Sequence, residues 1–271
     1  MAELPEIMNL AAQMQRTLID KVVQEVEVNQ PKCLNMPVDA FRATLLGQRF
    51  RGTIARGKWL VTSLPSGWLL ISLGMGGDLL YHADAATLPE KRRVAFSFRD
   101  GSYLSLSFWW FGYVHYAREL AEHAMVAKLG PNALDLSLDD FRALLQGKRG
   151  AVKTLLMDQS HIAGIGNVYV QDPLFKARIH PLRPANSLSE EEIAALWQAI
   201  RETLQKSVAL GGFAYEKNLY GEKGRWDTSY FQIAYREGKA CPRCGAVVTK
   251  IKTGSTSGFI CPTCQPLELD R

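Results

Sequence analysis

The chain has 271 residues, of which 47% are hydrophobic and 22% are charged, a composition that suits a packed globular protein and excludes wholesale disorder. No apolar run approaches 18 residues, because the longest candidate, "WLLISLGMGG", is broken by Ser72 and three glycines, and no signal peptide is recognisable. These features exclude a membrane partner and predict a cytoplasmic protein.

The basic residues are unevenly distributed along a chain whose formal net charge is +5. Residues 1–147 hold 15 Lys and Arg against 15 Asp and Glu, whereas residues 148–271 hold 17 against 12. The whole positive excess therefore lies in the C-terminal part. This asymmetry indicates a polyanionic partner for that part of the chain.

The chain opens with "MAELPEI", in which Glu3 is the first charged residue. One interpretation is an inert N-terminal tail, the usual state of a terminus. The alternative is chemical, because a residue as small as Ala2 favours removal of Met1 and would then carry the free α-amine. An α-amine has an ordinary pKa of about 7.7–8.0, against about 10.4 for lysine, so part of it is nucleophilic near neutral pH. Glu3 would stand beside it as a proton donor or acceptor.

The first 115 residues contain many short strand patterns. Apolar residues at helical spacing over 6–20 predict one amphipathic helix. Alternating or apolar runs then predict strands, and Asp100-Gly101 marks a hairpin. A β-sandwich or flattened barrel with the first helix packed on it is therefore expected. The runs cover residues 22–28, 49–57, 58–64, 68–74, 93–101 and 102–114.

Two segments of this region contain candidate ligand-binding side chains. "ARGKWLV" places Arg56 and Lys58 before an apolar strand, where a lone lysine is usually solvated surface. The segment 108–112, "FWWFG", contains four aromatic residues, and we expect at least two of them in the core. Any that are exposed in a cleft could stack on bases or wedge into a duplex.

A helical second domain is predicted over 126–212. Its helical patterns cover 136–146, 151–159 and 187–212. The last of them starts at Ser187 or Ser189, followed by Glu190–Glu192, and stops at Gly211–Gly212. A loop rich in glycine and aromatic residues, 213–238, then leads to the C-terminal segment.

The stretch "AGIGNVYVQD" lies between two of these helical patterns. Gly164 and Gly166 permit positive φ, and we expect the next helix to begin at about Asn167. A glycine turn that leads into a helix presents backbone N–H groups to an anion such as a DNA phosphate. The alternative is an ordinary turn between helices.

Of the five cysteines, one is isolated in the sequence and the other four form two CxxC pairs. Cys33 stands alone and is expected to be a small buried hydrophobic residue. "CPRC" and "CPTC" are separated by 16 residues, the spacing of a tetrahedral zinc site, and four thiolate ligands leave no open coordination position. Disulfides are the alternative, but a reducing cytosol disfavours them. We predict one structural Zn²⁺ bound by Cys241, Cys244, Cys261 and Cys264.

Taken together, these segments resemble the formamidopyrimidine-DNA glycosylase/endonuclease VIII family, and the resemblance covers nearly the whole chain. It rests on "ELPE" (3–6), "RGKWL" (56–60), "LGMGG" (73–77), "FG" (111–112), "LGPNAL" (129–134), residues 151–181 and the cysteine hairpin. It implies an α+β multidomain fold. The expected parts are an N-terminal β-sandwich catalytic domain with a packed helix (1–120), a helix–two-turns–helix domain (126–212), a lesion-side loop (213–238) and a four-cysteine β-hairpin zinc finger (239–267).

The resemblance also implies a DNA repair enzyme. Such a glycosylase flips out a damaged base, excises it and cleaves the strand as an abasic-site lyase through an imine at the N-terminal amine. By position, Ala2 would be the nucleophile, Glu3 the acid/base, and Lys58 would bind phosphate near the lesion and assist proton transfer. The partner would be damaged DNA, duplex or single-stranded, bound by a monomer in a bacterial, nucleoid-associated setting. The expected DNA-binding residues are Lys153, Asn167, Gly164, Gly166, Arg56, Trp109, Trp110, Phe111 and Thr256.

Four positions depart from the family pattern. Ala2 replaces the usual proline, and Asp172 replaces a glutamate after the glycine turn. The family's "DPRRFG" is "SFWWFG" here, so Trp109 or Trp110 replaces the arginine that reads the opposite base. Thr256 replaces a hairpin arginine. These departures predict an enzyme that is not a standard 8-oxoguanine:cytosine glycosylase.

Two other functions are compatible with parts of the sequence. A catalytically weak or inactive protein that binds damaged or abasic DNA would explain the missing arginines. A zinc-hairpin adaptor without DNA function would leave the basic C-terminal part and the glycine turn unexplained.

Overall fold

The computed structural model describes residues 1–267, and the chain divides into two compact units. The first comprises residues 1–128 and 208–225, and the second comprises residues 129–207 and the chain from Trp226 onward. The segment predicted as one loop over 213–238 is thus divided after Arg225. Within the described part, no helix has both the length and the hydropathy that a membrane span requires.

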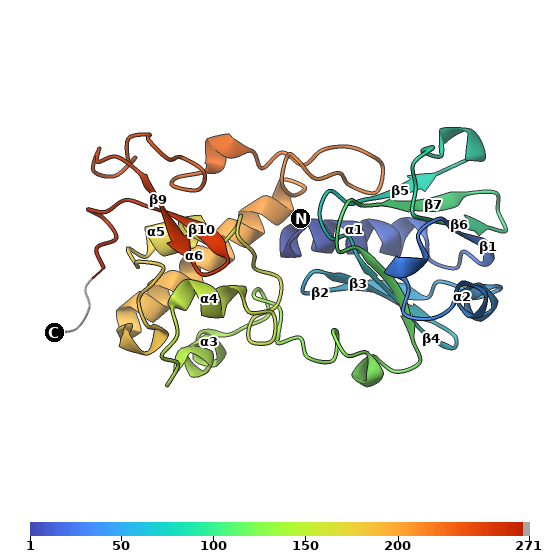
Figure 1. The fold of residues 1–271 in the computed structure, drawn as a ribbon, viewed down its shortest axis with the longest axis horizontal. Coiled ribbons are helices and arrows are strands. Elements are labelled where there is room, and N and C mark those ends of the chain that lie inside the picture. The colour runs from blue at the N-terminus through green and yellow to red at the C-terminus, as the bar shows by residue number, and fades with distance from the viewer. Residues whose placement is uncertain (268–271) are drawn as a thin grey trace. The chain divides into compact units, whose positions relative to one another are not determined.

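Two four-stranded antiparallel sheets form the first unit (Figure 1). This confirms the predicted sandwich and the hairpin at Asp100-Gly101, where Gly101 has φ +85° between β6 and β7. One sheet has the order β1-β6-β7-β5 and the other β2-β3-β4-β8. The strands are β1 (Val23–Val28), β2 (Gly52–Arg56), β3 (Trp59–Leu64), β4 (Gly67–Ser72), β5 (Asp78–His82), β6 (Val94–Phe98), β7 (Tyr103–Ser107) and β8 (Tyr113–Ala117).

Two features of these sheets differ from the prediction. β5 was not expected, because its sequence DLLYH is short and follows a glycine pair. The run 102–114 is not one strand, since β7 pairs with β5 and β6 whereas β8 pairs with β4 in the other sheet. The segment between β7 and β8 therefore crosses from one sheet to the other.

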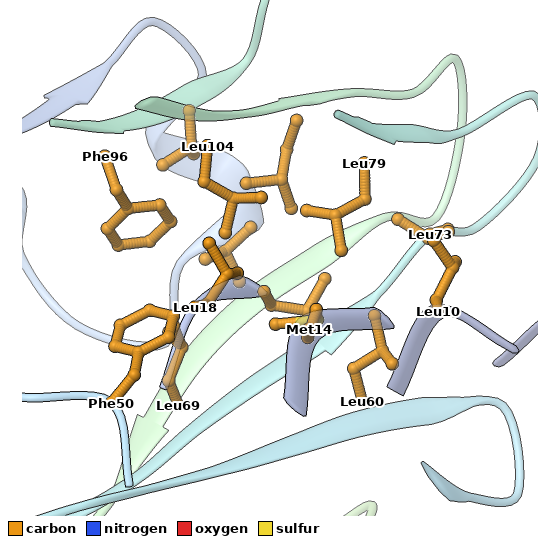
Figure 2. Close-up of a cluster of buried hydrophobic side chains, with 14 of the residues drawn as sticks. Leu10, Met14, Leu18, Phe50, Leu60, Leu69, Leu73, Leu79, Phe96 and Leu104 are labelled. Carbon is orange, nitrogen blue, oxygen red and sulfur yellow. The ribbon is translucent and has the colours of Figure 1, made fainter. Parts of the chain in front are cut away.

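The helix α1 (Leu4–Thr17) supplies one side of the core between the sheets. It begins two residues before the predicted range, because Glu3 and Glu6 form a reciprocal capping box and Pro5 occupies its first turn. Figure 2 shows Leu10 and Met14 of α1 among leucines of both sheets. A second helix, α2 (Val38–Leu45), was not predicted and buries Phe41 and Leu45, which lie about one turn apart.

The second unit consists of helices and one hairpin. The predicted start and stop of the long helix are confirmed, since Ser189 accepts from the Glu192 N–H and Gly211 and Gly212 have positive φ. The last two residues of that helix are counted with the first unit. The elements are α3 (Leu138–Leu145), α4 (Val152–Met157), α5 (Gln171–Lys176), α6 (Glu190–Ala209), β9 (Thr249–Thr253) and β10 (Thr256–Ile260).

The expectation of a helix start at about Asn167 was wrong, because α5 begins at Gln171. Proline lacks an N–H and is tolerated only in the first turn of a helix, so Pro173 fixes the start close to itself. The Gln171 side chain, not a helical backbone N–H, donates to the Asn167 carbonyl at 3.1 Å.

Candidate active site

Residues 2–7, which follow the exposed Met1 in the first unit, are buried. Ala2 and Glu3 are 4% and 3% exposed, and Glu6 is 4% exposed. The Glu3 N–H donates to Glu6 Oε2 at 2.8 Å, and Glu6 Oε1 accepts from the Phe213 N–H at 2.8 Å. Two carboxylates thus lie at the positive end of the α1 dipole, within five residues of the chain terminus. Glu6 also connects this helix to the segment that follows α6.

The α-amine belongs to Met1 in this structure, and it forms an ion pair with Glu216 Oε1 at 3.0 Å. The nitrogen of Ala2 is a peptide nitrogen, so the predicted nucleophile exists only after removal of Met1. Sequence reasoning missed Glu216, because a single acid in the glycine- and aromatic-rich segment 213–238 forms no motif. Its position close to the terminus depends on long-range contacts of residues 212–224.

Arg56 and Lys58 flank the turn between β2 and β3, where Arg56 is paired with Trp59. The side chain of Gln15, near the end of α1, accepts from the Thr53 N–H at 2.9 Å and fixes β2 along the helix. In Figure 1 the turn between β2 and β3 lies at the same end of this unit as the N-terminus. Lys58 is half-buried there.

The aromatic loop, residues 108–112, is mostly exposed. The expectation of at least two core aromatics in it was wrong, because only Phe108 is buried, against Gly112. The other three, Trp109, Trp110 and Phe111, are 72%, 66% and 68% exposed. Large apolar side chains grouped in this way on a surface commonly mark a binding site.

A second loop holds the aromatic loop in place. Met75 N–H donates to the Trp110 carbonyl at 2.8 Å, and the Trp109 N–H donates to the Met75 carbonyl at 3.0 Å. The Trp109 ring lies against Gly76, where a Cβ would approach it to 2.8 Å. Met75 is itself 45% exposed and was missed as a site residue, although "LGMGG" was recognised. The four side chains Met75, Trp109, Trp110 and Phe111 are called the apolar wedge below.

In the second unit, the ammonium group of Lys153 is buried among neutral oxygens. The residue is 1% exposed. Its Nζ donates to Asn167 Oδ1 at 2.9 Å, Thr253 Oγ1 at 2.7 Å, Thr256 Oγ1 at 3.0 Å and the Ser257 carbonyl at 2.7 Å. Burial lowers the pKa of Lys153 to about 8. The lysine therefore joins the glycine turn to the zinc hairpin.

Asn167 is held by the same network. Its Oδ1 also accepts from Gln171 Nε2 at 2.9 Å, and Gln171 Oε1 accepts from the Phe259 N–H in β10 at 3.2 Å. Gly164 has φ +104° and its N–H donates to Gln159 Oε1 at 2.8 Å, whereas Gly166 does not have positive φ. A cavity of about 320 Å³ lies beside this network, lined by Lys153, Thr154, Met157, Asp158, Thr253, Gly254, Ser255 and Thr256.

The carboxylate of Asp172 organises the chain before the zinc hairpin. Its Oδ1 accepts from the N–H groups of Ile233 and Ala234 at 2.9 and 3.1 Å, and its Oδ2 accepts from the Gln232 N–H at 3.1 Å. The residue is buried. Asp172 thus has a structural role in this chain.

Four cysteine sulfurs gather at the base of the β9–β10 hairpin, all within 4.8 Å of one another. This spacing and the all-thiolate donor set fit a tetrahedral Zn²⁺ with Zn–S bonds of about 2.3 Å. Zinc bound there would hold the hairpin together. Cys33 lies elsewhere, buried as predicted, and burial raises its pKa to about 11.

Three features together define the class of zinc-finger DNA glycosylases. They are a β-sandwich with a buried acid at its N-terminus, a helical unit with a glycine turn, and a four-cysteine hairpin. Three family profiles match the chain: the formamidopyrimidine-DNA glycosylase N-terminal domain over 1–107, the H2TH domain of that enzyme over 129–218, and the zinc finger found in FPG and IleRS over 238–267. The chain belongs to the formamidopyrimidine-DNA glycosylase family, which confirms the resemblance.

Relatives match over nearly their whole length. The formamidopyrimidine-DNA glycosylase of Chloroflexus aggregans is 35% identical, covering 98% of this chain and 99% of the relative. The formamidopyrimidine-DNA glycosylase of Enterococcus faecalis is 33% identical, covering 99% of this chain and 98% of the relative. A solved complex of Lactococcus lactis Fpg with DNA containing an abasic site has a TM-score of 0.88 at 26% identity. The match covers 98% of this chain and 100% of the Lactococcus lactis chain. A MutM complex with DNA containing carbocyclic 8-oxo-G has a TM-score of 0.87 at 28% identity. The match covers 97% of this chain and 99% of the MutM chain.

Proposed function

We propose that this protein excises a damaged base from DNA and cleaves the strand through an imine at the Ala2 amine, after removal of Met1. The observation that carries the proposal is the position of Glu3, one residue from that amine, in a buried site where 3% of its surface is exposed. The capping box of α1 holds the Glu3 carboxylate in this place, within reach of the groups that exchange protons during base release. A flipped nucleotide would bring its sugar to this end of the unit.

Each candidate residue then has a step to perform. The Ala2 amine attacks the sugar C1′, and Glu3 transfers protons as the base leaves. Lys58, in the turn between β2 and β3, would bind a phosphate and assist proton transfer, with Arg56 beside it. In the second unit, Asn167, the glycine turn and Thr256 would contact the DNA backbone, with Lys153 holding them from inside. The DNA complexes of Lactococcus lactis Fpg support damaged DNA as the partner.

The apolar wedge supports a selectivity different from that for 8-oxoguanine opposite cytosine. An arginine discriminates bases by hydrogen bonds to their edges, whereas an indole stacks on any base. Trp109 and Trp110 are both more than 60% exposed, so their rings are available for stacking. We infer that the wedge fills the space left by a flipped nucleotide without reading the opposite base.

Borohydride reduction with abasic-site DNA tests the activity. Purified protein of verified N-terminus is expected to form a covalent adduct whose peptide map ends at Ala2. An adduct at any lysine instead would contradict the N-terminal mechanism.

Absence of an adduct, with Met1 shown to be removed, would favour a second function, recognition of damaged or abasic DNA without efficient catalysis. The observations that favour this alternative are Ala2 in place of proline and Thr256 in place of the hairpin arginine.

A further inference from the structure

The carboxylate of Glu216 faces the N-terminal amine in the first unit. Its Oε1 lies 3.0 Å from the amine nitrogen of Met1, and the Glu216 side chain is only 13% exposed. The neighbouring cation, Lys217, does not compete for Glu216, because it is paired with Asp78 at 2.7 Å. A largely buried acid thus faces the amine of Met1, one residue before the Ala2 nitrogen that the proposed reaction uses.

The segment 212–224 fixes Glu216 in this position. Before Glu216, the Phe213 N–H donates to Glu6 in the first turn of α1. After it, the Leu219 N–H donates to Gln13 Oε1 at 2.9 Å, and the Leu219 carbonyl accepts from the Tyr81 N–H at 2.8 Å. The Leu219 side chain is fully buried. Because the segment is tied to α1 on both sides of Glu216, the acid keeps its place relative to the helix that follows Ala2.

Glu3 and Glu216 have different partners, which indicates different roles. Glu3 is engaged with Glu6 in the capping box of α1. Glu216 makes its ion pair with the amine itself. Removal of Met1 transfers the amine to Ala2, whose Cα is one residue spacing, about 3.8 Å, from that of Met1. A glutamate side chain can follow a displacement of this size by a change of rotamer.

We propose that Glu216 is a second catalytic acid/base, acting on the N-terminal amine during imine formation; this rests on the proposed function. Glu216 takes one proton from the α-ammonium, and the free amine adds to the C1′ aldehyde. A proton passes from nitrogen to oxygen in the resulting carbinolamine. Glu216 then returns its proton to the hydroxyl, the C–O bond breaks, and water leaves. The product is an iminium paired with the regenerated Glu216 carboxylate, so the atoms and charges balance.

Three variants test this proposal: E216Q, E216D and the matched control E222Q. Glu222 lies in the same segment, is exposed, and pairs with Asn218 at 2.9 Å. The rate of adduct formation with abasic-site DNA is measured by borohydride trapping in a single turnover. Affinity is measured separately with DNA that carries a tetrahydrofuran in place of the abasic sugar, which cannot form an imine.

We expect E216Q to form adduct about 10²-fold more slowly than the wild type, or slower still, within the range of general acid–base catalysis, while E216D recovers part of the rate. E222Q should match the wild type. Affinity for tetrahydrofuran DNA should stay within twofold for all three variants, and their melting temperatures should be unchanged.

Two results would overturn the role of Glu216 and leave the proposed function standing. One is an E216Q rate equal to that of the wild type. The other is a slower E216Q rate accompanied by a matching loss of affinity for tetrahydrofuran DNA or by a lower melting temperature. A wild-type protein that forms no adduct at all would overturn the proposed function and this role with it. The two failures are therefore distinguishable.

Discussion

At the residue scale, Lys153 has an unusual environment because its ammonium group is buried among four oxygens that carry no formal charge. Burial lowers its folded-state pKa to about 8, whereas an unfolded lysine keeps a pKa of about 10.4. Between these values the unfolded chain binds the proton and the folded chain does not. The contribution of Lys153 to the free energy of unfolding therefore rises with pH in this window.

Comparison of the wild type with K153M isolates this contribution. The difference in the free energy of unfolding should change in favour of the wild type by on the order of 1–2 kcal/mol between pH 7.5 and pH 9.5. Urea unfolding at the two pH values measures it. K148M, at an exposed lysine of the same unit, should show no such change. A pH-independent difference for K153M would mean that Lys153 keeps its proton throughout.

Glu3 is the residue on which the proposed chemistry depends most. Because Glu3→Gln keeps the size of the side chain but removes its acid, excision of the damaged base should fall by about 10²–10⁴-fold. Binding to the same DNA should change little, since the variant removes no cation. Single-turnover excision and equilibrium binding measure the two effects. Turnover similar to that of the wild type would remove Glu3 from the mechanism.

At the scale of elements, the apolar wedge exposes four large side chains on neighbouring loops. Stacking of a base on an aromatic side chain contributes about 1–3 kcal/mol, so Ala at both Trp109 and Trp110 should weaken binding to lesion duplexes by about 10–100-fold. The loss should be similar for all four bases opposite the lesion. L46A, at another exposed apolar residue of the first unit, serves as the control. A loss confined to cytosine would show that the wedge does read the opposite base.

The zinc hairpin supplies three of the oxygens that accept from Lys153, those of Thr253, Thr256 and Ser257. Chelation should release one Zn²⁺ per chain, unfold β9 and β10, and weaken DNA binding, because a hairpin of this size has no adequate core of its own. Metal analysis, circular dichroism and binding assays check these outcomes. Unchanged DNA binding by the metal-free protein would show that the hairpin is not a DNA-binding element.

Elements with strong local signals were predictable from the sequence, and those set by distant contacts were not. The cysteine spacing, the ends of α6 and the glycine of the β6–β7 hairpin each depend on residues close together in the chain. By contrast, α5 starts later than expected because Pro173 and the Gln171 side chain decide its first turn. Glu216 lies close to the amine only because Gln13 and Glu6 hold its segment. No local pattern encodes such a contact.

At the scale of the whole molecule, the distribution of charge predicts how binding responds to salt. Residues 1–147 are balanced, and the excess of five positive charges lies in residues 148–271. Neutralising DNA phosphates releases condensed counterions, so the logarithm of the binding constant should fall linearly with the logarithm of salt concentration. About five phosphate contacts would weaken duplex binding by about 10²–10³-fold between 50 and 200 mM salt.

Titration of binding against salt, with duplex and single-stranded abasic DNA in parallel, measures this response. The slope per phosphate is about −0.9 for duplex and about −0.7 for single strands, so equal numbers of contacts should give a shallower line for the single strand. Lines of equal slope would mean that the single strand contacts more cationic side chains than the duplex does. A flat response with both DNAs would mean that the basic C-terminal residues do not neutralise phosphates, and that binding depends on contacts other than these charges.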